Sequence, residues 1–269
     1  MYKHKLYKIT NKTSLHVGSG DTNFDLIDKQ IQRDVITKYP TIHASSLKGA
    51  LREYCEYKHD ENESKNFISY IFGDEESSGK VRFLEALLLS VPFRSDIHPY
   101  YNCTSPKAIA QLVDFAETFA LSLENLDALR KVSEYDRDEI LVKEGNPTIE
   151  DEKAKSSEEF NFDALEKILG KNVAIVPNNT FEEMLKDLPV IARNSLENGE
   201  SKNLWYEEVL PRESKLFTVI SEPTFLNNMD KKKLNNAFER LNGYLTSKDT
   251  IHIGANTSIG YGVTLFEEL

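Results

Sequence analysis

Polar and apolar residues alternate at the start of the chain and then change to a helical period. The run from Lys5 to Thr10 predicts a β-strand, and the glycine, serine and aspartate residues from Gly18 to Asp25 predict a loop after it. Ser45 and Ser46 can cap a helix, which we expect from about Ser46 to Tyr57. Its apolar positions at helical spacing are Leu47, Leu51 and Tyr54. The chain therefore opens with a strand, a long loop and a helix.

The middle of the chain predicts a buried strand followed by a second helix. Lys58 to Lys65 is highly charged and is expected to be a solvated link. Val81 to Val91 is apolar enough for a buried strand, which Pro92 should end. Ser105-Pro106 supplies a cap and a first-turn proline for the next helix. The apolar face of that helix comprises Ile109, Leu112, Val113, Ala116 and Phe119.

The last third of the chain follows a strand, helix, strand order. Ser214 to Ser221 predicts a strand, Asp230 an N-cap, and Val263 to Phe266 a short closing strand. The helix after the cap would bury Leu234, Phe238, Leu241 and Leu245. Together with the N-terminal strand and helix, this order indicates an α+β fold with a ferredoxin-like core. Glu124 to Phe160, with Gly145-Asn146-Pro147 inside it, is expected to be an irregular, partly mobile acidic insertion without its own core.

Charge is distributed unevenly along the chain. The formal net charge of −11 argues against binding to RNA phosphates, yet residues 121–170 hold fourteen acidic and seven basic side chains and account for −7 of it. Residues 1–60 hold ten basic and seven acidic side chains, a net of +3. The N-terminal region is thus compatible with RNA. Two cysteines without a metal or disulfide pattern, no apolar run long enough for a membrane span and no export signal predict a cytoplasmic protein.

Several residues between positions 16 and 52 could carry chemistry. Gly18-Ser19-Gly20 follows a strand, but no Gly-Lys-Ser/Thr comes after it, which excludes a nucleotide P-loop. Loop carboxylates can hold Mg²⁺ together with a phosphate, although most are simply solvated. Four lie in this loop: Asp21, Asp25, Asp28 and Asp34. His16 could act as an acid or base or be structural, and Lys48 behind Ser45 and Ser46 could bind a phosphate or be an ordinary surface lysine.

Two further segments leave more than one interpretation open. Trp205-Tyr206, beside Glu207-Glu208, could be a base-stacking platform or part of a core strand. The glycine-bearing run from Gly254 to Gly262 lies too close to the C-terminus for a dinucleotide-binding helix to follow. Its glycines would instead allow the backbone to approach a ligand or a neighbouring strand closely.

In their order along the chain, these motifs resemble the RAMP proteins of CRISPR systems, and among them the backbone subunit of type III-B (Cmr) effector complexes. The opening loop Leu15 to Gly20, the loop Ile27 to Asp34, Tyr39-Pro40 and Ser45 to Arg52 follow the family's order. So do Ile71-Phe72-Gly73, Phe83 to Ser95, Leu204 to Pro211 and Gly254 to Gly262. The resemblance covers nearly the whole chain apart from residues 125–160. Gln30 and Glu85 depart from the family pattern, which often has proline and aspartate there.

The resemblance implies a single RAMP domain, 1–269, with an RRM-like palm from residues 1–95 and 212–269. It implies a mostly helical, acidic insertion at about 96–189 and a β-hairpin thumb at about 190–203, where Glu197-Asn198-Gly199-Glu200 has the composition of a hairpin turn. Copies of the chain would stack head to tail on a CRISPR guide RNA with other Cmr subunits. The thumb would flip out every sixth guide–target base pair.

The same resemblance implies roles for individual residues. Asp28 matches the catalytic aspartate and is an expected metal ligand, with Mg²⁺ or Mn²⁺ as the expected cofactor for cleavage of complementary target RNA. His16 and Glu207 would support it. The implied RNA-binding residues are Gly18, Ser19, Gly20, Ser45, Ser46, Lys48, Arg52, Gly254, Asn256, Gly260 and Gly262. A non-catalytic RNA scaffold and the equivalent type III-A subunit are the alternatives, whereas a stand-alone metabolic enzyme fits least.

Overall fold

Four antiparallel strands form the centre of the main sheet. The computed structural model describes residues 2–20, 27–58, 61–224 and 236–269. The four strands are β1 (Tyr2–Asn11), β4 (Ala86–Phe93), β12 (Lys215–Pro223) and β14 (Val263–Glu268). They lie in the order β14-β1-β12-β4, and β13 (Ile251–His252) pairs with the outer edge of β14. This is the 4-1-3-2 order of a ferredoxin-like sheet, so the predicted fold class is confirmed.

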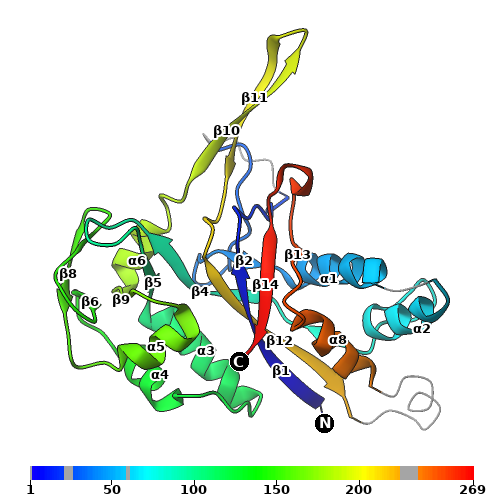
Figure 1. Cartoon of the computed structure of the whole chain (residues 1–269), viewed down its shortest axis with the longest axis horizontal. Coiled ribbons are helices and arrows are strands. Elements are labelled where there is room, and N and C mark those ends of the chain that lie inside the picture. The colour runs from blue at the N-terminus through cyan, green and yellow to red at the C-terminus, as the bar shows by residue number, and fades with distance from the viewer. Residues whose placement is uncertain (1, 21–26, 59–60, 225–235) are drawn as a thin grey trace.

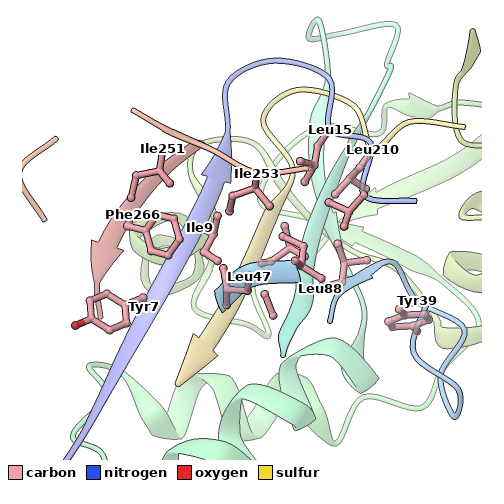
Figure 2. Close-up of a cluster of buried hydrophobic side chains, with 14 of the residues drawn as sticks. Tyr7, Ile9, Leu15, Tyr39, Leu47, Leu88, Leu210, Ile251, Ile253 and Phe266 are labelled. Carbon is pink, nitrogen blue, oxygen red and sulfur yellow. The ribbon is translucent and has the colours of Figure 1, made fainter. Parts of the chain in front are cut away.

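The central sheet is covered on both faces because its strands alternate between two apolar cores. On β1, Tyr7 and Ile9 face one core, whereas Leu6 faces the other. The first core, shown in part in Figure 2, includes residues of α1 (Ala44–Lys58), α2 (Glu61–Phe72) and α8 (Ala237–Leu245). Each large apolar side chain that is fully buried here contributes about 1.5–3 kcal/mol.

The second core lies between the central sheet and helices of the inserted half, which is on the left in Figure 1. The sheet continues from β4 through five short strands, in the order β5-β9-β6-β8-β7. Their bounds are β5 (Tyr101–Thr104), β6 (Ile140–Val142), β7 (Thr148–Ile149), β8 (Glu152–Ser156) and β9 (Val173–Ile175). The helices of this half are α3 (Pro106–Thr118), α4 (Leu126–Ser133), α5 (Phe162–Leu169) and α6 (Asn178–Met184).

The expectation of an irregular segment from Glu124 to Phe160 was therefore wrong. Residues of α4 and β6 contribute Leu129, Val132 and Leu141 to the second core. The acidic residues between these apolar positions occupy the outer surface. The acidic residues of this segment form its solvated outer face, so they do not prevent it from forming helices and strands.

Most predicted helices and strands are confirmed, with shifted ends. Ser105 Oγ accepts the N–H of Ala108 at 3.2 Å and caps α3 as predicted. Helix α1 begins at Ala44, so Ser45 and Ser46 lie inside its first turn and do not cap it. The predicted solvated link gives way to α2 from Glu61, and Asp230 and Leu234 lie outside the described residues.

The strand expected from Val81 to Val91 is divided, and proline does not end it. It forms β3 (Arg82–Phe83) and then β4, which continues through Pro92 to Phe93. Strand β12 pairs with β4 only as far as Ser90, so one edge of β4 has no ladder partner in β12 at Pro92. A strand tolerates proline at such a position because the missing N–H breaks no bond in the ladder.

A two-stranded hairpin stands away from the palm at the top of Figure 1. It consists of β10 (Val190–Glu197) and β11 (Glu200–Glu208), which pair only with each other among the named strands. Its tip is Asn198-Gly199, with φ of 53° and 86°, as a two-residue type I′ turn requires. Strand β11 runs past Asn203 to Glu208, so the predicted Trp205-Tyr206 pair lies on the hairpin, close to the palm.

Candidate functional site

The loop that carries Asp28 lies between the glycine loop and the base of the hairpin. On one side, Ser19 N–H donates to Gln30 O at 3.0 Å and Gln32 N–H to Val17 O at 2.8 Å. On the other side, Lys29 N–H donates to Tyr206 O at 3.1 Å and Glu208 N–H to Lys29 O at 2.9 Å. Three segments far apart in the sequence therefore lie side by side. Their pairing fixes residues 28–32 without a regular strand.

Asp28 presents its carboxylate to solvent at this junction. The side chain is exposed, and its Oδ2 accepts the N–H of Tyr206 at 2.8 Å. One oxygen is thus oriented by the hairpin backbone, while the carboxylate stays accessible to a ligand. This combination of a fixed position and an open approach suits a group that reacts with, or binds, a molecule in solution.

Glu207 joins the hairpin to the other parts of the site. Its side chain is 1% exposed. Oε1 accepts Lys29 Nζ at 3.1 Å and Trp205 Nε1 at 2.8 Å, while Oε2 accepts Arg193 Nε at 3.0 Å and Asn256 Nδ2 at 2.9 Å. Burial alone would raise the pKa of Glu207, but the bonds from Trp205, Arg193 and Lys29 outweigh it and lower the pKa to about 2. Glu207 is therefore a charged anchor that positions other residues.

Glu208 and His16 complete the buried part of the junction. Glu208 accepts Ile31 N–H at 3.1 Å and pairs with Arg33. His16 is 3% exposed, and its Nδ1 donates to the carbonyl of Glu208 at 2.7 Å. The structure thus gives His16 a positioning contact. Sequence reasoning did not single out Arg33 or Glu208, because only the tertiary fold shows that the partly exposed Arg33 pairs with the buried Glu208.

Gln32 connects the glycine loop to the start of α1. Its Nε2 donates to Gly18 O at 3.2 Å and Ser46 Oγ at 3.0 Å, and its Oε1 accepts His43 N–H at 2.7 Å. Three predicted regions meet at this buried amide. No sequence signal had marked Gln32, since a glutamine in a polar loop is usually solvated.

The cationic side chains Lys48 and Arg52 of α1 lie beside the loop from Gly73 to Gly79. Lys48 and Arg52 line a polar pocket of about 420 Å³ opposite the loop from Gly73 to Gly79. Arg52 donates to Gly73 O at 3.2 Å and to Glu56 at 2.8 Å. In the described part of the chain Lys48 has no ion-pair partner, and Ser45 is exposed. Lys48 is thus not engaged in an ion pair, in a pocket whose other wall carries Asp74, Glu75 and Glu76.

The C-terminal glycine run packs directly on the segment that contains His16. Ala255 N–H donates to His16 O at 2.9 Å, and Gly262 N–H to Ser14 O at 2.9 Å. A Cβ on Gly254 would lie 2.4 Å from His16 O. Gly254 and Gly262 therefore permit close contact between backbones, which is one of the two interpretations that the sequence left open. Gly260 differs, because a Cβ there would have no neighbour within 4 Å.

Gly262 offers a direct test of this packing. A Cβ there would lie 2.0 Å from Ile253 O, whereas Gly260 has a similar positive φ and no neighbour within 4 Å. We expect Gly260→Ala to cost about 1–2 kcal/mol for the backbone conformation alone. Gly262→Ala should cost about 3 kcal/mol or more, measured by urea unfolding, because the clash adds to the strain. Equal losses for the two variants would contradict this account.

The described residues do not form a metal-binding cage. Across residues 2–20, 27–58, 61–224 and 236–269, no three His, Cys, Asp or Glu side chains come together in a way that could hold a metal ion. Asp28 offers a single carboxylate, and Asp21 and Asp25 lie outside the described residues. The predicted metal site is therefore not formed by these residues alone.

Comparison with known families decides where this arrangement belongs. The model of the RAMP superfamily matches residues 8–266, which is nearly the whole chain. The chain belongs to the RAMP superfamily. This RAMP protein is 28% identical to the CRISPR system Cmr endoribonuclease Cmr4 of Pyrococcus furiosus, over 95% of this chain and 93% of the relative. It is also 36% identical to the CMR subunit Cmr4 of Saccharolobus solfataricus, over 34% of this chain and 30% of the relative.

Solved structures support the same RAMP fold. A chain of the type III-B Cmr-beta complex bound to cognate target RNA superposes with a TM-score of 0.79 at 18% identity, covering 99% of this chain and 97% of that one. Oligomeric Cmr4 from Pyrococcus furiosus gives 0.74 at 22% identity, with 99% and 98% coverage. Among the helices that the structure describes in this RAMP protein, none is both long and apolar enough to cross a membrane.

Proposed function

We propose that this chain is a backbone subunit of a type III-B CRISPR ribonucleoprotein, where it binds the guide RNA and cleaves complementary target RNA. The main support is its similarity to an endoribonuclease of Pyrococcus furiosus along 95% of the chain. The exposed, oriented carboxylate of Asp28 at the hairpin base agrees with such an activity. The subunit would act in the cytoplasm, repeated along one guide with other Cmr subunits.

Asp28 is proposed as the group that accepts a proton from the target RNA. If the hairpin displaces a nucleotide from the duplex, its 2′-oxygen can align with the adjacent phosphorus. Asp28 would take the 2′-hydroxyl proton as the 2′-oxygen attacks phosphorus. The bond to the 5′-oxygen of the next nucleotide then breaks, and that oxygen takes a proton from water. The products would be a 2′,3′-cyclic phosphate and a 5′-hydroxyl.

Metal dependence is a separate part of the proposal. Asp28 supplies one carboxylate, so a divalent ion such as Mg²⁺ or Mn²⁺ would depend on RNA phosphate and water for its other ligands. Cleavage of labelled target by the assembled complex with Mg²⁺, with Mn²⁺ and with EDTA tests the dependence. Undiminished cutting in EDTA would contradict it.

The same assay distinguishes cleavage from a purely scaffolding role. An active subunit should produce fragments of complementary RNA at regular spacing and leave a non-complementary RNA intact. A scaffold would retain both guide and target without producing fragments. Fragments that persist when Asp28 is replaced in every copy would indicate a different nuclease in the preparation.

Lys48 is proposed as a contact to guide RNA phosphate. Lys48→Glu should weaken guide binding by roughly tenfold or more, because a favourable charge contact becomes a repulsive one. Lys186→Glu, on α6's side of the molecule, is the matched control and should bind like the wild type. Filter binding at several salt concentrations measures both. A Lys48→Glu variant with unchanged affinity and an unchanged salt slope would remove this residue from the RNA path.

A further inference from the structure

The three most exposed large apolar side chains in the described part of the chain gather at two places. Ile36 is 89% exposed and Val35 is 80% exposed, and these neighbours form the tip of one loop. Tyr57 is 84% exposed and lies near the end of α1. Single exposed apolar residues are common, but an adjacent pair at a loop tip is a patch that another surface can cover.

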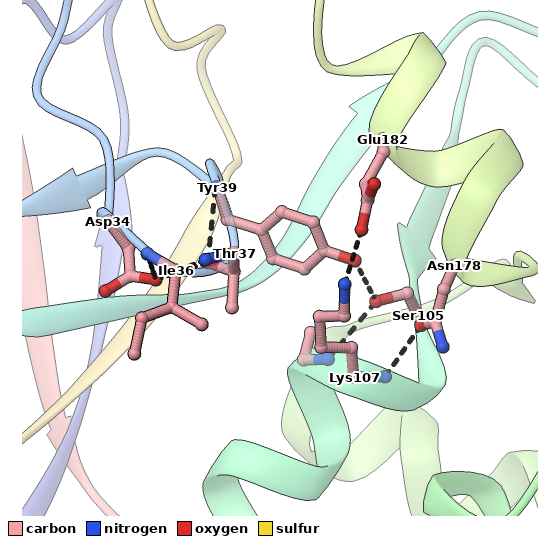
Figure 3. A network of polar contacts seen from close by, with 9 residues as sticks. Asp34, Ile36, Thr37, Tyr39, Ser105, Lys107, Asn178 and Glu182 are labelled. Carbon is pink, nitrogen blue, oxygen red and sulfur yellow. Dashed lines mark hydrogen bonds and ion pairs between the residues drawn. The ribbon is translucent and has the colours of Figure 1, made fainter.

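The Val35–Ile36 tip is held in a fixed conformation. Asp34 Oδ1 accepts the N–H of Ile36 at 3.1 Å, the N–H of Thr37 at 2.6 Å and the hydroxyl of Thr37 at 2.8 Å. Figure 3 shows this turn, with the Ile36 side chain pointing away from the Tyr39–Ser105 network. Because the loop is already ordered, binding through this tip would cost little conformational entropy.

Tyr57 belongs to a pocket of about 350 Å³, here named the α1 pocket. Its lining combines aromatic and small side chains with one carboxylate. The residues that matter here are Ala50, Glu53, Tyr54, Tyr57, Thr250 and His252. Tyr54 is fixed by a 3.3 Å bond from its hydroxyl to Tyr244 O. The pocket is thus a partly apolar hollow with an acidic rim.

The tip and the pocket lie on opposite sides of the molecule. Arg33, at the base of the tip loop, donates to Leu185 O at 3.0 Å, just after α6. The α1 pocket is formed by α1 and the segment around β13. Figure 1 shows α6 and α1 on opposite sides of β1 and β14. A contact between the two patches therefore cannot form within one chain.

One exposed charge lies beside each patch, and the two charges are of opposite sign. Lys38, beside the tip, and Glu53, on the rim of the pocket, are both exposed. Among the residues that the structure describes, neither takes part in an ion pair. Lys38 is therefore a possible partner for Glu53, beside an apolar tip and a partly aromatic pocket.

We infer that the Val35–Ile36 tip of one copy binds the α1 pocket of the next copy, with Lys38 facing Glu53. Two different patches on opposite sides form a heterologous contact, which leaves one tip and one pocket free at the ends and so extends an open chain. This inference rests on the proposed function, in which copies repeat along a guide RNA. It adds which surfaces join them.

Loss of the apolar tip should separate the copies. Ile36→Glu should raise the dissociation constant between copies by about tenfold or more, because a charge would enter an apolar contact. Ile97→Glu changes another exposed isoleucine, 54% exposed, that belongs to neither patch, and should leave assembly unchanged. Sedimentation velocity of the full chain without RNA measures both. Equal assembly by Ile36→Glu and the wild type would overturn the inference.

Paired cysteines test the direction of the contact. Cys55 and Cys103 are buried, so a short bismaleimide should react with introduced cysteines. A chain with both Ile36→Cys and Thr250→Cys should give a ladder of cross-linked products. A mixture of the two single variants should give only dimers, and each single variant alone should give none. Self-linking of a single variant would indicate a two-fold contact and would overturn the head-to-tail arrangement.

The outcome is separable from that of the proposed function. Cross-linking and sedimentation need no RNA, so a ladder from a chain that cuts nothing would support the inference and contradict the nuclease. Regular cleavage without a cross-linked ladder would support the nuclease and contradict the inferred contact.

If Tyr57→Ala lowers guide RNA binding but leaves sedimentation unchanged, the α1 pocket binds RNA and the inference is wrong. Restoration of Lys38→Glu assembly by Glu53→Lys would support the pairing, and failure of that rescue would refute it.

Discussion

Replacement of Asp28 by asparagine in the assembled complex should reduce the rate of target RNA cleavage by about 10²- to 10⁴-fold, the range that a general base contributes. Asparagine keeps an oxygen that can accept the N–H of Tyr206, which lies 2.8 Å from the carboxylate, so the loop should stay in place. Guide and target affinities should therefore change little. Single-turnover cleavage and equilibrium binding, measured on the same preparation, separate chemistry from assembly.

Two controls sharpen this result. Asp127→Ala removes an aspartate whose side chain is 96% exposed on α4, far from the hairpin, and should cut like the wild type. Asp28→Ala also removes the acceptor for Tyr206, so it should lose activity at least as completely as Asp28→Asn. If the asparagine variant retained full activity, Asp28 would act only as an anchor for Tyr206, and the proposed proton transfer would be wrong.

Loss of the Glu207 carboxylate should destabilise the fold of the site. Glu207→Ala leaves four donors without their acceptor, two of them cationic, in a position where the side chain is 1% exposed. The loss of these bonds should cost about 1–3 kcal/mol, because the Lys29 side chain is 53% exposed and the Arg193 side chain 21% exposed, so water can solvate both cations. Glu200→Ala, at an exposed position of the same strand, should change the free energy of unfolding by less than about 0.5 kcal/mol.

The pH dependence of stability gives a second measurement of the same anchor. The folded protein holds the pKa of Glu207 at about 2, below its ordinary value of 4.5. The contribution of Glu207 to stability should therefore be complete above about pH 4.5 and be lost as pH falls towards about 2. Urea unfolding of the wild type and of Glu207→Gln should show a gap that narrows over this range. A gap that does not depend on pH would indicate that the carboxylate charge contributes nothing.

The order of the palm elements could be predicted from sequence because each depends on local periodicity. Leu47 and Leu51 mark α1 by their helical spacing, and both are fully buried in the structure. The inserted half could not be predicted in the same way. Its strands are short, from two to five residues, and a strand such as β6 is specified by pairing with β8 and β9 rather than by its own pattern.

The candidate site shows the same division between local and tertiary information. Asp28 and Lys48 were found through the order of motifs around them, and their roles stay predictions. Gln32 was missed because its importance arises from three partners at residues 18, 43 and 46, which only the folded chain brings together. For Glu207 the four donors come from three separate segments, so no spacing in the sequence could show that they share one carboxylate.

The hairpin pairs with no other named strand. Its length can therefore change without loss of strand pairing in the palm. A lone two-stranded ribbon is marginally stable in water, so its anchoring at Glu207 and Glu208 sets the direction in which it points. Side chains along a strand alternate between its two faces. Adding two residues to each strand, between the tip and Trp205, would therefore lengthen the ribbon and leave every side chain on its present face. Adding a single residue to each strand would move the side chains between the insertion and the tip to the opposite face of the ribbon. The reach of the hairpin can thus change in discrete steps, without any change to the core of the palm.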